Sequence, residues 1–162
     1  MNQYQLEVDS INQVVAEFNK YLTEFWQIPK IDPLSDIGKR SIVKILHGRW
    51  DDFLFPKSSS PGVYFIFGNH RELKTRKCVY IGKASLSSSI GLRLYSHLHP
   101  NKLSEHFTMN YGKDIYILNY IASIDMEKIP FMAPALEEYL ISSLSGKINL
   151  LNVAGNSAGG EQ

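Results

Sequence analysis

Apolar residues near the start of the chain recur at intervals of three and four, the spacing of one face of an α-helix. The positions with this spacing are Val8, Ile11, Val15, Phe18, Leu22 and Phe25. Asp9 or Ser10 is suited to cap the start of such a helix, and the prolines at 29 and 33 end it. The stripe is too short for a coiled coil, so we expect it to pack on the rest of the protein rather than in a dimer.

A second, shorter helix is predicted after the first, with Ser35 as its N-cap. Its inner face would consist of Ile37, Ile42, Val43 and Leu46. Two aspartates follow, Asp51 and Asp52, but adjacent side chains point in different directions along a helix or strand. This pair therefore gives little reason to expect a metal site.

The loop-like segment Pro56–Pro61 is the best domain boundary in the chain. Beyond it, the apolar runs Gly62–Phe67 and Cys78–Ile81 flank a polar, mostly basic segment, as in a β-hairpin. The run Ile115–Ala122 is the most strand-like in the chain and is expected to be a central strand buried on both faces. We expect residues 1–60 to form a helical extension packed on a domain of residues 61–162.

Two further helices are predicted around these strands. The first begins near Ser87–Ser89 and ends at Pro100, with an apolar side of Leu92, Leu94, Tyr95 and Leu98. Asn101–Asp114 is polar and is expected to be irregular. The second opens at Pro130 and Pro134 and ends at Gly146, with Leu136, Tyr139, Leu140 and Leu144 facing inward. The fold class is therefore α+β, with a small, mainly antiparallel three-stranded sheet flanked by helices.

Composition and charge limit the classes of function only partly. The 162 residues carry a formal net charge of +1, which is no whole-chain signature of nucleic-acid binding. Between His70 and Arg93, however, six basic residues stand against the single acidic Glu72. The lone Cys78 excludes an intrachain disulfide and a CxxC zinc site. The sequence shows neither a secretory signal nor an apolar run of membrane-spanning length, so we expect a cytoplasmic protein without a membrane partner.

Short motifs on the predicted strands suggest a chemical function. GVY occupies residues 62–64 and YIG occupies residues 80–82, and they are followed in order by Arg93, Glu137 and an asparagine. This ordered set resembles the GIY-YIG nuclease family, with Val63 in place of the usual isoleucine. The resemblance covers about residues 61–152, whereas the first sixty residues match no family that we can name.

The resemblance implies a role for each matching residue. Tyr64 would act as general base on water or relay its proton, and Tyr80 would contact the region of the scissile phosphate. Arg93 would stabilise phosphate charge. Glu137 would hold a single divalent metal ion, Mg²⁺ or alternatively Mn²⁺, because family members commonly have a Leu-Ile pair three and four residues later, as here. Its neighbour Glu138 is expected to be a solvated surface carboxylate.

The remaining site residues rest on weaker parts of the resemblance. A supporting asparagine is expected behind the metal. Asn149 has the twelve-residue spacing from Glu137 that is seen in many members, whereas the local sequence makes Asn152 look like the motif, so we prefer Asn149 and retain Asn152. Lys83, directly after YIG, and His97, four residues after Arg93, occupy places used by a subset of members.

These assignments predict a metal-dependent endonuclease that hydrolyses a phosphodiester bond, with DNA as the favoured partner. The hairpin would add nucleic-acid-binding residues, namely Arg71, Lys74, Arg76 and Lys77. Two alternatives remain open. One is a non-catalytic nucleic-acid-binding module of the same fold, and the other is a protein-interaction domain that uses the amphipathic N-terminal helix. Each candidate residue alone would more often be structural, so the prediction depends on their joint order.

Overall fold

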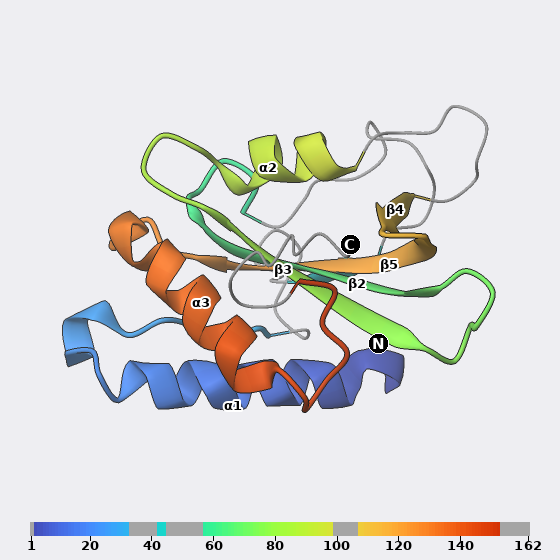
Figure 1. The fold of residues 1–162 in the computed structure, drawn as a ribbon. Coiled ribbons are helices and arrows are strands. Elements are labelled where there is room, and N and C mark those ends of the chain that lie inside the picture. Colours follow the sequence, from blue (N-terminus) through green and yellow to red (C-terminus); the bar gives the residue numbers. More distant parts are fainter. Residues whose placement is uncertain (1, 33–41, 45–56, 99–106, 153–162) are drawn as a thin grey trace, which may run out of the picture.

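Three helices lie on two faces of one β-sheet in the computed structural model (Figure 1). The structure describes residues 2–32, 42–44, 57–98 and 107–152. Helix α2 (Ile90–His97) covers one face, and α1 (Gln5–Asn19) and α3 (Ala133–Leu144) lie side by side under the other. The two faces therefore contact different helices.

The described sheet has five strands, and every pair of them is antiparallel. The strands are β1 (Ile42–Lys44), β2 (Gly62–His70), β3 (Lys77–Ala84), β4 (Thr108–Tyr111) and β5 (Asp114–Asp125). Their order is β1-β5-β2-β3, with β4 also paired to β5. The predicted α+β class and antiparallel sheet are confirmed, but the three expected strands are extended by β1 and β4.

Strand β1 corrects the prediction of a second N-terminal helix. Ile42 and Lys44 pair with Ala122 and Tyr120 of β5, so the segment is extended and not helical. The β-branched Ile42 and Val43 favour a strand when a partner edge is available. Ser35, Ile37, Leu46 and the aspartate pair at 51–52 lie outside the described residues.

Strand β4 corrects the expectation of an irregular segment before β5. Thr108–Tyr111 pairs with the start of β5 through a tight turn at Gly112 and Lys113. Gly112 has φ +62°, a left-handed conformation that glycine adopts without a Cβ clash. The polar composition of this segment matches an exposed hairpin, because the last two residues of β4 face solvent.

The strand buried most completely is β2 and not the run Ile115–Ala122. Eight of the nine β2 residues are buried, because β2 lies between β5 and β3 and has helices on both faces. In β5 burial is continuous only over residues 121–124 and alternates before them. The first half of β5 is therefore covered on one face only, and the sequence of β5 alone does not reveal this.

Helix α1 begins and ends earlier than its apolar pattern suggests. Asp9 and Ser10 lie inside the helix and not at its start. The predicted stripe is buried as far as Phe18, but Phe25 falls in a short 3-10 turn (Glu24–Trp26) and is 74% exposed. The helix stops at Asn19, whose side-chain amide both donates to and accepts from the backbone of Ile28. The returning chain therefore folds back along the helix.

Each face of the sheet has its own apolar core. On one side, residues from α1 and α3 pack with Val63, Phe65 and Phe67 of β2. On the other side, residues from α2 pack with Tyr64 and Ile66, the alternate positions of the same strand. No helix among the described residues is long and apolar enough to cross a membrane.

Candidate active site

Tyr64 and Tyr80 lie on neighbouring strands and on the same face of the sheet. Tyr64 is opposite Gly82 and Ile66 is opposite Tyr80 in the β2–β3 register, so the two tyrosines are diagonal neighbours. Their ring centroids are 6.4 Å apart and their hydroxyl groups form a hydrogen bond. The side chains face α2, as the packing of both rings in that core shows. The hairpin therefore brings the two tyrosines of GVY and YIG together.

Gly82 makes room for the Tyr64 ring. A Cβ atom added at residue 82 would overlap the Tyr64 hydroxyl and Cζ and lie 2.7 Å from Cε2. Tyr64 is only 2% exposed, so its ring has no solvent space into which it could move. The glycine of YIG is thus required by close packing across the strand pair.

A Gly82→Ala substitution should lower the free energy of unfolding by about 1–3 kcal/mol, the usual cost of overpacking a core. Urea denaturation of both proteins measures this difference. In a Tyr64→Leu background the same substitution should cost less, because the ring that the new methyl group meets is gone. Equal stability of Gly82→Ala and wild type would show that the strand pair is looser than described.

Burial keeps both tyrosines protonated. Loss of solvation raises the pKa of Tyr64 well above its usual value, and the neighbouring Tyr80 and Glu137 raise it further. Burial also raises the pKa of Tyr80, with Glu137 again adding to the effect. Arg93 acts in the opposite direction on both phenols, so Arg93 and Glu137 lie within electrostatic range of the pair. Neither tyrosine is a phenolate near neutral pH.

Arg93 is presented by α2. The helix is capped by Ser89, whose hydroxyl accepts a hydrogen bond from the Leu92 backbone N–H at 3.3 Å. Its buried side consists of Ile90, Leu94 and Leu98, and Arg93 is exposed beside it. The predicted serine cap is confirmed. The predicted apolar side is wrong in part, because Leu92 and Tyr95 are exposed.

His97 is the last residue of α2, but its side chain lies outside the part of the structure that can be described. Whether it faces the same way as Arg93 stays a prediction from their four-residue spacing.

Glu137 is presented by α3 and is paired with Lys83. Burial of Leu136 and Leu140 against the sheet leaves Glu137 at the border of the packed face, while Glu138 is exposed. The Glu137 Oε2 atom lies 2.8 Å from the Lys83 Nζ atom, and the two side chains are 16% and 33% exposed. The ion pair is therefore largely shielded from solvent.

The candidate residues approach one another from both faces of β3. Lys83 is opposite Val63, which belongs to the core beneath α1 and α3. The Lys83–Glu137 pair therefore lies on that side, whereas the two tyrosines lie on the α2 side. Glu137 nevertheless raises the pKa of both tyrosines, so its charge acts on them across the strand.

Of the two asparagines, Asn152 lies beside the YIG segment. Its side-chain Nδ2 donates to the Ile81 carbonyl at 2.6 Å, and its Oδ1 accepts from the Ile81 N–H at 3.0 Å. Asn149 instead donates to the Lys77 carbonyl, at the far end of β3. Asn152 is thus the asparagine that contacts the YIG segment, whereas Asn149, the residue preferred from its spacing, contacts the other end of the strand.

A short loop, residues 57–61, fixes the start of β2 to α2. Its carbonyls at Ser60 and Ser58 accept hydrogen bonds from the N–H groups of Ile90 and Gly91 at 2.9 and 2.7 Å. A Cβ at Gly91 would lie 2.8 Å from the Ser58 carbonyl oxygen. The strand that carries Tyr64 and the helix that carries Arg93 are therefore held at a fixed distance.

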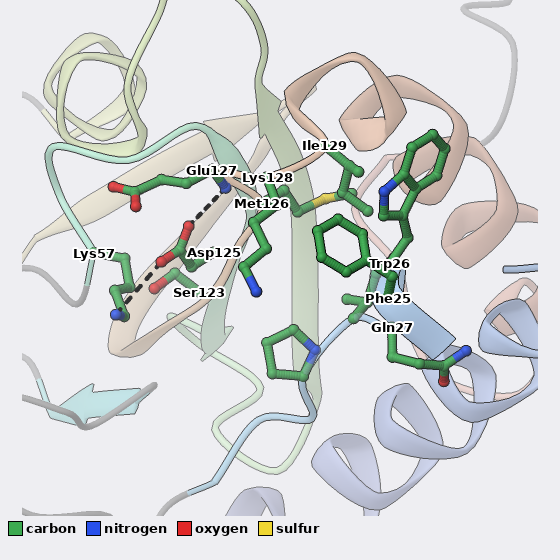
Figure 2. A pocket seen from close by; sticks show the side chains of 12 residues that line it. Phe25, Trp26, Gln27, Lys57, Ser123, Asp125, Met126, Glu127, Lys128 and Ile129 are labelled. Atoms are coloured by element: carbon green, nitrogen blue, oxygen red, sulfur yellow. Dashed lines mark hydrogen bonds and ion pairs between the residues drawn. The ribbon is translucent and has the colours of Figure 1, made fainter. Parts of the chain in front are cut away.

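The same loop is joined to the segment that leads into α3. The Ser60 hydroxyl donates to Glu127 Oε1 at 2.9 Å, and the Met126 N–H donates to the Pro61 carbonyl at 3.0 Å. Lys57 pairs with Asp125 at 3.4 Å, as drawn in Figure 2. The composition of this loop predicts a domain boundary but does not reveal its contacts with α2 and with the segment before α3.

The basic hairpin is not part of this cluster. Arg71, Lys74 and Arg76 lie in the turn between β2 and β3 and are exposed. Lys77 and Lys83 are six residues apart on β3, which corresponds to about 20 Å along a strand. Arg76 and Lys77 are close to carboxylates, Asp114 at 3.7 Å and Glu7 at 3.6 Å. The basic residues of the turn, together with Lys77, can bind a ligand that extends away from the candidate site. They cannot reach the site itself.

Glu137 is the carboxylate of the cluster that suits a metal ion. No group of three or more His, Cys, Asp and Glu residues in the described ranges could hold one. Mg²⁺ commonly takes only one or two protein carboxylates and completes its shell with water and phosphate oxygens. A shielded Glu137 on a fixed helix fits such a site, whereas it does not fit a closed structural site for zinc.

The pocket in Figure 2 lies apart from these residues. It has a volume of about 400 Å³ and lies between the turn after α1 and the end of β5. Phe25 and Trp26 form one wall, and Asp125 and Glu127 lie across from them. None of the predicted site residues lines it.

Tyr111 of β4 also acts on the tyrosine pair, although no sequence pattern singles it out. It is partly exposed, and its phenol contributes to the raised pKa of Tyr80. Its segment shows no motif, and only the β4–β5 pairing brings it into range.

Comparisons with known proteins add nothing to this geometry: no protein-family model, curated protein or solved structure matches the chain. What the cluster can do therefore follows from the residues themselves.

Proposed function

We propose that this protein is a metal-dependent endonuclease that hydrolyses a phosphodiester bond in DNA. The observation that carries the proposal is the cluster of Tyr64, Tyr80, Arg93, Glu137 and Lys83, because these groups interact although they come from four different elements. Each type of group answers one requirement of phosphodiester hydrolysis. The order of the motifs, which resembles that of GIY-YIG nucleases, supports the same proposal.

Arg93 would bind the scissile phosphate. Its guanidinium group stays charged and can contact two non-bridging oxygens at once. The side chain is exposed at the flank of α2, so a phosphate can approach it without any rearrangement of the core. As charge develops in the transition state, this contact becomes stronger and lowers the barrier.

Tyr64 and Tyr80 would position the attacking water and relay its proton. Their raised pKa values argue against a free phenolate that acts as a base. A hydrogen-bonded pair of hydroxyls can accept a proton at one oxygen while it gives up a proton at the other. Asn152 would keep this pair in place, because it fixes the backbone of Ile81 between Tyr80 and Gly82.

Glu137 would hold the metal ion. A divalent cation bound there would stabilise the charge of the leaving alkoxide. The carboxylate is supplied by a helix that packs firmly on the sheet through Leu136 and Leu140, so its position is fixed before a ligand arrives. Such preorganisation is what electrostatic stabilisation of a transition state requires.

The hairpin would hold the DNA at a distance from the cleaved bond. The span of about 20 Å from Lys77 to Lys83 corresponds to about six base pairs of duplex. Arg71 and Lys74 would contact phosphates there without any role in the chemical step. This arrangement favours a polymeric substrate over a mononucleotide.

The proposal is tested by incubation of the purified protein with duplex, branched and single-stranded DNA, with Mg²⁺ or with EDTA. We expect cleavage with Mg²⁺ and none with EDTA. DNA binding that weakens steeply with salt but never leads to cleavage would favour the non-catalytic binding module. The absence of any salt-sensitive binding would favour a protein-interaction domain.

A further inference from the structure

Lys83 occupies one of the two oxygens that Glu137 could offer to a metal ion. The 2.8 Å contact joins Nζ to Oε2 in a pair that is mostly shielded from solvent. A divalent cation at Glu137 would therefore be bound only a few ångströms from an ammonium group. The attraction of one carboxylate is then divided between two cations, and the cations repel each other.

Within the ranges that the structure describes, no group of carboxylates beside Glu137 offsets this repulsion. Glu138, the next residue of α3, is exposed. Its side chain points away from that of Glu137, because successive residues of a helix face different sides. The described part of the chain holds no cluster of three potential ligands. The metal affinity of Glu137 thus depends strongly on where the Lys83 ammonium group lies.

We propose that Lys83 competes with the metal ion for Glu137 and that a DNA phosphate relieves this competition. The inference rests on the proposed function, and it adds a mechanism that couples metal binding to substrate binding. Lys83 is one-third exposed, so a phosphate of bound DNA that lies beside the pair would give its ammonium group a second anionic partner. When Lys83 turns to the phosphate, both Glu137 oxygens are available to the metal, so DNA raises metal affinity and the metal raises DNA affinity equally.

The test measures Mn²⁺ affinity in the absence of DNA, from the EPR signal of the free ion. Lys83→Met should bind Mn²⁺ about tenfold more tightly than wild type, within the usual range of coupling between sites. Lys83→Gln is a second neutral variant, for the case in which the methionine variant does not fold. Lys83→Arg keeps the charge and should bind Mn²⁺ as wild type does. Glu137→Gln should remove the tight binding from the Lys83→Met protein.

Lys77→Met is the matched control. Lys77 lies on the same strand, is paired with Glu7 at 3.6 Å, and has nearly the same exposure of both side chains, 36% and 14%. Its removal should leave Mn²⁺ affinity unchanged. An equal gain in Lys77→Met would attribute the effect to net charge and overturn the inference. Unchanged or weaker Mn²⁺ binding in the neutral Lys83 variants would also overturn it, whether or not the wild type cleaves DNA.

Discussion

Replacement of Glu137 by alanine is expected to reduce Mg²⁺-dependent DNA cleavage by roughly 1000-fold or more, since metal stabilisation of a transition state is worth several kcal/mol. Glu137 is the carboxylate that is both shielded and within electrostatic range of the tyrosines. DNA binding in EDTA should persist, because phosphate contacts come from arginine and lysine. Single-turnover cleavage and a binding titration measure the two effects separately.

Glu138→Ala provides the matched control for this substitution. It removes the same group from the same helix at an exposed position, so cleavage should remain at the wild-type rate. The Glu137→Ala protein should unfold within about 1 kcal/mol of wild type, because Lys83 is one-third exposed and its ammonium group can be hydrated once its partner is removed. Loss of cleavage in Glu138→Ala with activity retained in Glu137→Ala would invalidate the proposed metal ligand.

Arg93→Ala is expected to lower the cleavage rate on saturating DNA by about 100–1000-fold, the usual effect of losing one preorganised charge-stabilising donor. The effect should fall on the rate more than on affinity, because the contact strengthens as charge develops. Arg93→Lys should restore part of the rate, since lysine keeps the charge but lacks the planar two-point contact. The measurement is single-turnover cleavage by the three proteins.

A rate for Arg93→Ala equal to that of wild type, once DNA is saturating, would make Arg93 a binding residue or a bystander. The substitution should not disturb α2, because the packing of this helix depends on Ile90, Leu94 and Leu98. Circular dichroism and the thermal midpoint of the variant check that the helix is still folded.

The sequence predicted the regular parts of the fold through periodicity. The apolar runs in β2 and β3 and the three-and-four spacing in α1 and α3 correspond to elements in the structure. It failed at β1 and β4, because each is a short strand that forms only against the edge of β5. Such strands depend on a partner distant in sequence, and local propensity carries little information about that partner.

The candidate site was predictable where a motif fixed the residue type. Tyr64 and Tyr80 were assigned to neighbouring strands, and the register places them on one face. The Lys83–Glu137 pair could not be foreseen, because it depends on how α3 crosses the edge of the sheet. The preference for Asn149 over Asn152 rested on spacing, whereas the hydrogen bonds to β3 distinguish the two residues by position.

The double hydrogen bond of Asn152 with Ile81 has two parallels elsewhere in the chain. Asn12 exchanges the same two bonds with Ile31, at 3.0 and 2.8 Å, and Asn19 does so with Ile28. In each case the side-chain amide takes the place of a peptide group that a neighbouring strand would supply. A carboxamide is needed for this, because a carboxylate has no hydrogen to donate and would face the isoleucine carbonyl with a negative charge. Spontaneous deamidation of Asn152 to aspartate would therefore loosen the backbone beside Tyr80 by the exchange of a single nitrogen for oxygen.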